Sequence, residues 1–501
     1  MQRGNTSYWH ATSPVDEYPA LQENLEVDVA IIGGGIVGLT LATLLKRAGR
    51  SVAVLEGRKL LSGTTGGTTA KVTSGHGLLY RTLVQKHGLD AARAYAAAQE
   101  EALERMASWI RDESIDCDFE RRPNYAYCIS SDDVSQIQEE VEAERDAGLE
   151  VSYTTDTDLP FAVAAALRLE NQAQFHPSKY LAHFARQIPG DGSHIFDTSR
   201  VLDVIEGTPC ELEVNGNTVR AEHVVVATNY PLLDRGLFFA RVHPKRSYAI
   251  AGPIDAAADP MGMYISTEPT RSIRTTPLED GKRLLIISGA GHSVGQDYDT
   301  EEKYRLLEDF ARERFGLTDV RYRWSAQDGT TIDQIPYVGT LRRSGERIFT
   351  ATGFAKWGMT NATVAAGIIC DAIVGRENRW AALFDPHRLT VKQSATTAAE
   401  ENVKVALHWF RDRVLHPQRG TFDDLAPGEA AVRQTGLKNL AGYRDEDGEL
   451  HVVSAVCTHL ACIVAWNSAE KSWDCPCHGS RFDPDGRVLH GPAMKDLASE
   501  T

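Results

Sequence analysis

The chain has 501 residues, of which 42% are hydrophobic and 24% charged, a composition typical of a folded protein with about two to four domains. Its formal net charge of −16 argues against nucleic acid or an anionic membrane surface as a partner, because both attract basic surfaces. Residues 1–27 lack the basic start and apolar stretch of a secretory signal, and no run resembles a membrane span. We therefore expect a cytoplasmic protein.

A glycine-rich turn follows the first predicted strand. Residues 1–26 predict an irregular N-terminal arm, and the apolar run at 27–32 predicts a buried strand. Gly33 permits a tight turn, Gly35 lets the backbone approach a pyrophosphate, and Gly38 allows close packing of a helix on the strand. Because a helix N-terminus stabilises phosphate charge, the pattern predicts a dinucleotide site.

An acidic residue stands where such a site needs one. A helix is predicted to about Ala48, and a second strand at 51–55 ends at Glu56, 23 residues after Gly33. A carboxylate at this place binds ribose hydroxyls. The alternative is a glycine-rich turn in another α/β protein, and the motif alone does not decide between FAD and NAD.

Three later segments favour FAD. The small, hydroxyl-rich residues 62–71 form either a flexible linker or a loop that wraps a dinucleotide. Residues 222–229 predict a hydrophobic strand that ends in a polar tip, and residues 350–360 lead into an apolar helix to about Val374. The N-terminus of that helix would stabilise negative charge on a reduced flavin.

The sequence between and after these segments predicts helices and then short strands. Helical spacing covers 89–113, and a second helix opens at 176–180 with Ser178 as its cap. Short strands are predicted at 247–250, 263–266, 271–274 and 284–287.

Five residues in and beyond these strands are candidate substrate contacts. They are Tyr248, Arg274, His292, Lys356 and Trp357. An arginine holds a carboxylate bidentately, although an exposed cross-strand arginine explains Arg274 equally well. His292 is either an acid/base group or a structural histidine.

The chain leaves this region through a connector at 386–420. An apolar stripe predicts an amphipathic helix at 398–414 that packs against the protein.

The most specific motif follows near the C-terminus. Cys457 and His459 form C-x-H, and after fifteen residues Cys475 and His478 form C-x-x-H. Two thiolates and two imidazoles suit a [2Fe-2S] cluster in which histidines replace cysteines on one iron. A structural zinc site is the alternative, but C-x-H is unusual for a zinc ribbon.

This segment resembles a Rieske domain over about residues 422–497. The motifs that carry the resemblance are CTHLxC, CPCHGS and Gly491-Pro492-Ala493. It is more similar to the respiratory type, which implies a Cys462–Cys477 disulfide, although disulfides are uncommon in the cytoplasm. Respiratory relatives carry a Tyr where this chain has Phe482, and usually a Gly where it has Ala461. Because hydroxyl hydrogen bonds to the sulfurs raise the potential, we predict a lower potential here.

Residues 27–376 resemble the glycine/D-amino-acid oxidase family of FAD enzymes. The fingerprint at Gly33 and the Gly-Phe-x-x-Trp-Gly-Met-Thr helix start carry this resemblance. It implies a substrate sheet at about 236–330. Since no cysteine near these segments is placed for covalent attachment of a flavin, we expect non-covalent FAD. The resemblance also implies that the flavin-ring loop contains Thr68, Thr69 and Lys71, that Val201, Ala227 and Thr228 lie near the adenosine, and that Gly353, Gly358, Met359 and Thr360 lie at the isoalloxazine.

Together these features predict an α/β (α+β) Rossmann-type FAD domain at 27–385, with an antiparallel substrate sheet, and an all-β Rieske domain at 421–501. We expect an oxidoreductase that oxidises a small amine or amino-acid-like substrate at FAD. Electrons would then pass singly through the cluster to an acceptor protein or a quinone, although the reverse direction fits the same parts. An oxygen-using FAD oxidase with a structural Rieske domain and a non-catalytic redox sensor remain the alternatives.

Overall fold

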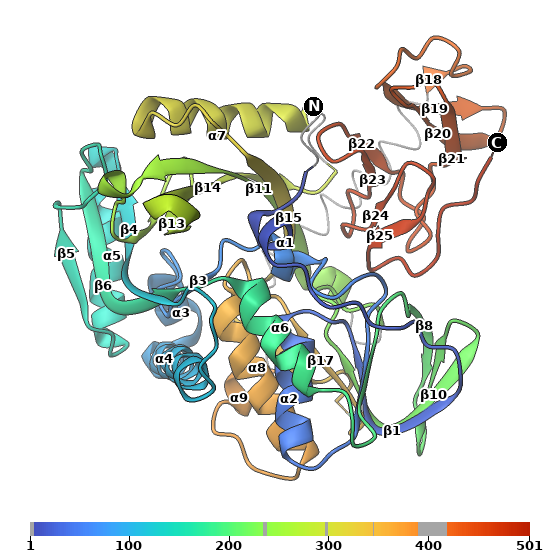
Figure 1. The fold of residues 1–501 in the computed structure, drawn as a ribbon, viewed down its shortest axis with the longest axis horizontal. Helices are drawn as coiled ribbons and strands as arrows, with labels where there is room; N and C mark the ends of the chain where they lie inside the picture. Colours follow the sequence, from blue (N-terminus) through green and yellow to red (C-terminus); the bar gives the residue numbers. More distant parts are fainter. Residues whose placement is uncertain (1–4, 234–237, 296–298, 344, 389–417, 501) are drawn as a thin grey trace.

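The computed structural model describes residues 5–233, 238–295, 299–343, 345–388 and 418–500. They form two large sheets with helices around them and a small C-terminal β-domain beside them (Figure 1). The connector helix predicted at 398–414 lies outside the described residues.

The mixed composition of the N-terminal arm predicted an irregular structure, but part of the arm is helical. It contains a short helix, α1 (Tyr8–Thr12), which Ser7 caps by accepting a hydrogen bond from the amide of His10. Trp9 is completely buried, and its Nε1 donates a 2.7 Å hydrogen bond to the carbonyl oxygen of Thr68. A buried aromatic residue fixes this arm to the hydroxyl-rich loop.

The first sheet contains the predicted dinucleotide-binding strands, and most of its central strands are parallel. It runs in the order β16 (Tyr337–Thr340), β17 (Ile348–Thr352), β10 (Asn217–Val226), β1 (Leu25–Ile32), β2 (Val52–Leu55) and β7 (His194–Phe196). A hairpin of β8 (Val201–Ile205) and β9 (Cys210–Val214) attaches to it through β10. All of β2 and the last four residues of β1, Val29 to Ile32, are apolar and buried, as expected for strands covered on both sides.

Two helices lie against each other on this sheet, α2 (Ile36–Arg47) and α8 (Gly358–Ile373). Every residue from Met359 to Cys370 is buried, so the apolar sequence of α8 matches a helix enclosed on all sides. α2 also contacts α6 (Pro177–Gln187).

The second sheet contains the predicted substrate strands in mainly antiparallel order. It runs β15 (Tyr322–Thr331), β11 (Val242–Asp255), β14 (Lys282–Ser293), β13 (Arg271–Pro277), β12 (Met263–Ser266), β4 (Glu120–Cys128), β6 (Ala165–Gln174) and β3 (Lys71–Val72), with β5 (Val151–Thr154) paired to β6. The region between the flavin segments was predicted to be mainly helical. It also supplies β3 to β6, and β4 joins the sheet by pairing with β12 in parallel.

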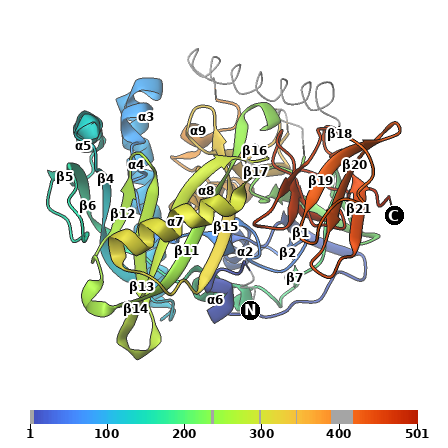
Figure 2. The same ribbon diagram turned by 90° about the horizontal axis from the view of Figure 1, so that it is seen from above.

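The remaining helices cover this sheet or fill the space beside it. They are α3 (Tyr80–His87), α4 (Leu89–Asp112), α5 (Val134–Asp146), α7 (Thr300–Phe315) and α9 (Ala381–Phe384). α7 crosses one face and contacts β11 and β14 (Figure 2). The predicted cap of α6 was wrong, since the side chain of His176, not Ser178, accepts the hydrogen bond from the amide of Lys179.

The C-terminal domain is all-β and has its own core. One sheet has the order β18 (Gln418–Arg419), β19 (Ala430–Thr435), β20 (Lys438–Arg444) and β21 (Leu450–Ser454). The other has the order β22 (Ala465–Asn467), β23 (Ser472–Asp474), β24 (Arg481–Phe482) and β25 (Val488–His490). The fold predicted from the sequence is therefore confirmed in its α/β layers, its substrate sheet and its separate β-domain.

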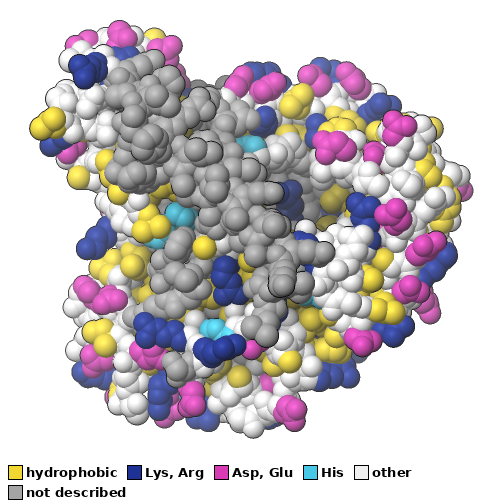
Figure 3. All heavy atoms as spheres, turned by 180° about the vertical axis from the view of Figure 1, so that it is seen from behind, with side chains coloured by type: hydrophobic (Ala, Val, Ile, Leu, Met, Phe, Trp, Pro, Cys, Tyr) yellow, Lys and Arg dark blue, Asp and Glu magenta, His cyan; other side chains and the backbone are white. Residues whose placement is uncertain are grey.

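The surface carries charges of both signs. On the face seen in Figure 3, basic and acidic side chains of the described residues are interspersed. Among the helices that the structure describes, none combines the length and apolar character needed to cross a membrane.

Candidate cofactor and substrate sites

The glycine turn brings three backbone segments into contact. Gly33 has φ +110°, and a Cβ there would lie 2.6 Å from the carbonyl oxygen of Ala227. A Cβ on Gly38 would lie 2.0 Å from the carbonyl oxygen of Gly33. Gly35 is the N-cap of α2 and places no side chain between the helix N-terminus and the cavity beside it. This arrangement fits a pyrophosphate on the backbone N–H groups.

Glu56 follows β2 and is held by backbone donors. Its Oε2 accepts a 2.8 Å hydrogen bond from the amide of Gly34, and its Oε1 accepts a 2.9 Å bond from the amide of Arg58. Glu56 lies in the wall of one of two adjoining cavities, called the second cavity below. A carboxylate at this place suits recognition of ribose hydroxyls.

The second cavity is walled by both parts of the chain. The predicted adenosine residues Val201, Ala227 and Thr228 line it, as do Val488, Leu489, His490, Gly491, Ala493 and Met494 of the β-domain. It shares Gly35, Thr64, Thr65, Ala227 and Asn229 with a neighbouring cavity, called the first cavity below. The two cavities therefore form one elongated space along the N-terminus of α2, as an extended dinucleotide requires.

The first cavity lies between the hydroxyl-rich loop and the start of α8. Thr68, Thr69 and Lys71 line one side, and Gly358 and Met359 line another. The positive end of the α8 dipole therefore faces this space and would stabilise negative charge there.

Two predicted isoalloxazine residues stand behind this wall. Gly353 has φ +80°, and a Cβ there would lie 2.2 Å from Cγ2 of Thr331. Thr360 is buried, and its Oγ1 donates a 3.2 Å hydrogen bond to the carbonyl oxygen of Thr73. Neither is among the described residues that line the first cavity. Their observed contacts shape the wall.

Lys71 has a buried amino group at the base of the flavin-ring loop. Its Nζ donates a 2.5 Å hydrogen bond to the carbonyl oxygen of Tyr264. Burial lowers the pKa of Lys71 well below its ordinary value, and the nearby Arg274 lowers it further. The amino group is thus held against the cavity by its hydrogen bond to the main chain.

Three of the five candidate substrate contacts line the first cavity: Tyr248, Lys356 and Trp357. His292 stands behind Tyr248, with the Tyr248 hydroxyl 3.1 Å from His292 Nε2 and His292 Nδ1 2.9 Å from the carbonyl oxygen of Ser293. Since the carbonyl needs a donor, Nδ1 carries the proton and Nε2 accepts from Tyr248. His292 therefore orients a wall residue and is not itself in the lining.

Arg274 does not occupy the place expected of a substrate-binding arginine. It is completely buried, and its Nη1 donates to the carbonyl oxygens of Thr69 and Ala70 at 3.0 and 2.8 Å. It is not among the described residues that line either cavity. Burial lowers the pKa of Arg274 to about 9. The side chain holds the flavin-ring loop, because neighbouring backbone carbonyls take its hydrogen bonds.

Sequence reasoning missed two residues at this site. Asp328 lines the first cavity, and burial raises its pKa to about 6, although the neighbouring Lys356 opposes that rise. His76 stacks beneath Trp357, with ring centroids 4.7 Å apart. Neither belongs to a recognisable motif, and only the chain's folding places them there.

Two loops of the β-domain bring the predicted cluster ligands together. The Cys457 and Cys475 thiols hydrogen-bond each other, which lowers the pKa of Cys457 to about 7 and raises that of Cys475. The rings of His459 and His478 lie 5.0 Å apart and nearly perpendicular. Nδ1 of His459 is buried without a hydrogen-bond partner among the described residues. Two thiols, two imidazoles and this unused nitrogen fit a [2Fe-2S] cluster better than a closed polar network.

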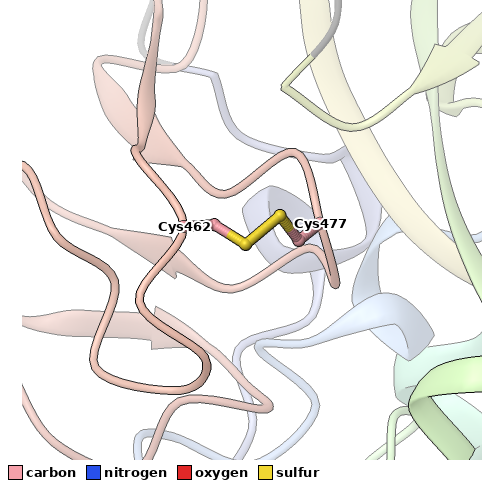
Figure 4. The surroundings of a disulfide bond; sticks show 2 residues. All are labelled: Cys462 and Cys477. Carbon is pink, nitrogen blue, oxygen red and sulfur yellow. A yellow bond between two sulfur atoms is a disulfide. The ribbon is translucent and has the colours of Figure 1, made fainter. Parts of the chain in front are cut away.

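A disulfide joins the two loops. Cys462 and Cys477 are bonded, with their Cα atoms 6.5 Å apart (Figure 4). Ser480 lies in the second loop, where its hydroxyl bonds to Cys457 and accepts a 3.0 Å hydrogen bond from the amide of Ala493. The Gly-Pro-Ala segment thus supports the loop that carries Cys475.

Comparison with known proteins agrees with both sites. The family model described as FAD dependent oxidoreductase (DAO) matches residues 28–372, and that of the Rieske [2Fe-2S] domain matches 419–500. The Bacillus subtilis protein YhfW, named for a Rieske 2Fe-2S iron-sulfur centre, is 36% identical over 495 residues, which cover 98% of this chain and 96% of the relative.

Two further relatives match the flavin part. Gamma-glutamylputrescine oxidoreductase of Escherichia coli is 25% identical over 415 residues, 77% of this chain and 93% of that protein. The solved L-proline dehydrogenase of P. horikoshii shares the fold with a TM-score of 0.60 and 20% identity, over 74% of this chain and 98% of that one. The chain therefore belongs to the DAO family of FAD-dependent oxidoreductases, and it carries a C-terminal Rieske domain for a [2Fe-2S] cluster.

Proposed function

We propose that the chain is a dehydrogenase that oxidises a small amine or amino-acid-like substrate and passes the electrons one at a time to an acceptor protein or a quinone. The observation that carries this proposal is a hydrogen bond that joins the two parts of the chain beside both sites. Gln327 lies between two residues that line the first cavity, and its side chain hydrogen-bonds to Gly479 in the cluster loop. Bound FAD accepts two electrons from an organic substrate, and a [2Fe-2S] cluster carries one.

The residues that would hold the cofactors follow from the two sites. For the cluster we propose Cys457, His459, Cys475 and His478 as ligands. For FAD we propose the turn at Gly33 and Gly35, Glu56, the loop residues Thr68, Thr69 and Lys71, the adenosine residues Val201, Ala227 and Thr228, and the α8 start at Gly358 and Met359.

The substrate would enter the first cavity beside Trp357. Tyr248 and Trp357 offer apolar walls, while Asp328 and Lys356 offer one charge of each sign. A carboxylate attracts a substrate ammonium group, and a lysine attracts a substrate carboxylate. The Escherichia coli relative, whose name includes an amine, supports the same substrate class. Because Arg274 is engaged by backbone carbonyls, it has no part in this proposal.

The proposal also places the protein in the cytoplasm. Its four cysteines outside the β-domain, Cys117, Cys128, Cys210 and Cys370, are buried free thiols, which suits a reducing compartment.

A variant without the cluster tests the function. Cys457→Ser should still let substrate reduce the flavin, but it should lose the reduction of cytochrome c, a one-electron acceptor too large to enter the cavity. Cys210→Ala, which changes a buried thiol in β9, should keep both activities. Full substrate-dependent oxygen consumption by Cys457→Ser, with no cytochrome c reduction by the unaltered protein, would instead identify an oxidase.

A further inference from the structure

Gln327 occupies a special place on β15. Its neighbours Ala326 and Asp328 line the first cavity, and Gln327 itself is 4% exposed. Its main-chain carbonyl oxygen accepts a 2.7 Å hydrogen bond from Thr64 Oγ1 and a 3.0 Å bond from Asn229 Nδ2. Thr64 and Asn229 line both cavities. The backbone of Gln327 is therefore fixed to the rim of the cofactor space.

The side chain of Gln327 points in the other direction, to the β-domain. Its Nε2 donates a 2.8 Å hydrogen bond to the carbonyl oxygen of Gly479, and its Oε1 accepts a 3.2 Å bond from Nη2 of Arg246. Gly479 directly follows the candidate ligand His478. Since both ends of the amide are bonded, its orientation is determined and it has no second arrangement that keeps both contacts.

The backbone of the cluster loop approaches the flavin part so closely that two contact positions have no room for a side chain. Gly479 has φ +77°, and a Cβ there would lie 2.5 Å from Gln327 Nε2 and 2.8 Å from Cβ of Pro244. At the other side of the loop, a Cβ on Gly295 would lie 2.7 Å from the backbone nitrogen of Pro476. Two glycines, one from each part, thus permit this contact.

A buried charge network fixes the orientation of the same loop. Arg246 is 1% exposed, and its Nε lies 3.9 Å from Oδ2 of Asp474, the residue before Cys475. Asp474 also accepts a 2.9 Å hydrogen bond from Arg481. Buried ion pairs add little net stability, but removing one partner is costly, so they favour one orientation of the two surfaces.

We propose that Gln327 is a positioning residue that holds the Cys475–Ser480 loop at a fixed distance from the flavin cavity, so that electrons pass between the two cofactors within one chain. The inference rests on the proposed function. With both cofactors bound, the substrate's two electrons would leave the reduced flavin one at a time, each converting a ferric iron of the cluster to ferrous, and the flavin proton would pass to solvent. The external one-electron acceptor reoxidises the cluster after each transfer. The rate of electron transfer falls steeply with distance. Electrons would therefore reach the cluster more slowly if the loop moved away from β15.

Two variants of Gln327 and one matched control test this role. Gln327→Met keeps the length of the side chain but removes both hydrogen bonds, whereas Gln327→Glu keeps an acceptor for Arg246 and removes the donor to Gly479. The control, Thr300→Val, removes two other buried hydrogen bonds between the two parts. Thr300 Oγ1 donates to Asn467 Oδ1 at 2.8 Å and accepts from the amide of Ala469 at 2.9 Å, at the start of α7.

Two measurements on the protein with both cofactors bound distinguish a positioning role of Gln327 from a general effect on protein stability. Hydrogen exchange of a peptide that spans Cys475–Ser480 should speed up by roughly 2- to 12-fold in both Gln327 variants, the change in opening equilibrium that one hydrogen bond supplies. Flash photoreduction of the flavin by a photosensitised donor should show slower electron arrival at the cluster. In Gln327→Met the cluster's reduced-state EPR spectrum and midpoint potential should stay unchanged, because the ligands and the Ser480 hydroxyl are intact and no charge is added.

The outcomes distinguish the inference from the function on which it rests. The inference is overturned if the Gln327 variants transfer electrons as fast as the unaltered protein, or if Thr300→Val slows the transfer equally. If the unaltered protein passes no electron from flavin to cluster after the flash, the proposed function itself fails. The flash needs no organic substrate, so an unidentified substrate does not affect this result.

Discussion

The imidazole of His76 lies parallel to the indole of Trp357, with ring centroids 4.7 Å apart and 13° between the planes. His76 Nδ1 lies 2.8 Å from the Tyr95 hydroxyl, and its Nε2 lies 2.8 Å from the carbonyl oxygen of Thr73. Since the carbonyl needs a donor, Nε2 carries the proton and Nδ1 accepts from Tyr95. A buried, neutral histidine therefore supports the indole that lines the first cavity.

Replacing His76 by phenylalanine should keep the ring stack but remove one hydrogen bond each from the Tyr95 hydroxyl and the Thr73 carbonyl oxygen, which keep their contacts with Asn361 and Thr360. We expect His76→Phe to lower the free energy of unfolding by about 1–3 kcal/mol, measured by denaturant titration of the protein with FAD bound. In a Tyr95→Phe background the same change should cost less, because the hydrogen bond between His76 and the Tyr95 hydroxyl is already absent. Equal costs in both backgrounds would contradict the role assigned to the Tyr95 bond.

The same histidine should make stability depend on pH. Burial lowers the pKa of His76 to about 3 from its ordinary value of 6.5. The unfolded chain therefore takes up a proton in this range that the folded chain does not. The contribution of His76 is complete above about pH 6.5 and falls by about 1.4 kcal/mol per pH unit as the pH drops toward 3. Between pH 6 and about 4, unfolding of His76→Phe should depend less on pH than that of the unaltered protein. Identical slopes would show that His76 is protonated in the fold.

Ala461 carries backbone strain in the first cluster loop, with φ +56°. Glycine adopts this conformation without the Cβ penalty, so Ala461→Gly should stabilise the β-domain by about 1 kcal/mol, seen as a higher melting temperature. The same change at Ala441, on the regular strand β20, should destabilise the domain. A lower melting temperature for Ala461→Gly would contradict this account.

Phe482 should help to set the potential of the cluster. It is completely buried on β24, after Ser480 of the second loop. Phe482→Tyr would add a hydroxyl that stabilises the more negative reduced state, so the midpoint in a redox titration should rise. Ser480→Ala, which removes the hydroxyl bonded to Cys457, should lower it. An unchanged midpoint in Phe482→Tyr would remove Phe482 as the cause of a low potential.

Short motifs predicted the cofactor sites well, because their chemistry depends on residues close together in sequence. In the turn at Gly33 and in the cluster loops at Cys457 and Cys475, the spacing of neighbouring residues is enough to indicate the function. The second sheet was predicted only in part. The pairing of β4 with β12 joins residues more than a hundred positions apart, and no local sequence pattern predicts it.

Side-chain direction was the least predictable property. Arg274 lies on a correctly predicted strand, but the carbonyl oxygens of Thr69 and Ala70 lie within its reach and take its hydrogen bonds. Trp9 belongs to a segment with no periodicity, yet it is completely buried against the flavin-ring loop. In both cases a distant partner determines the role, and only the folded chain supplies that partner.

The central claim is that substrate electrons pass from FAD to the cluster inside this chain. It is tested most directly by anaerobic titration of the protein with amines, D- and L-amino acids and hydroxy acids, while flavin absorbance and the cluster's reduced-state EPR signal are recorded together. We predict that one compound bleaches the flavin and that the cluster signal then appears. A flavin that bleaches fully while the cluster stays oxidised would contradict the account.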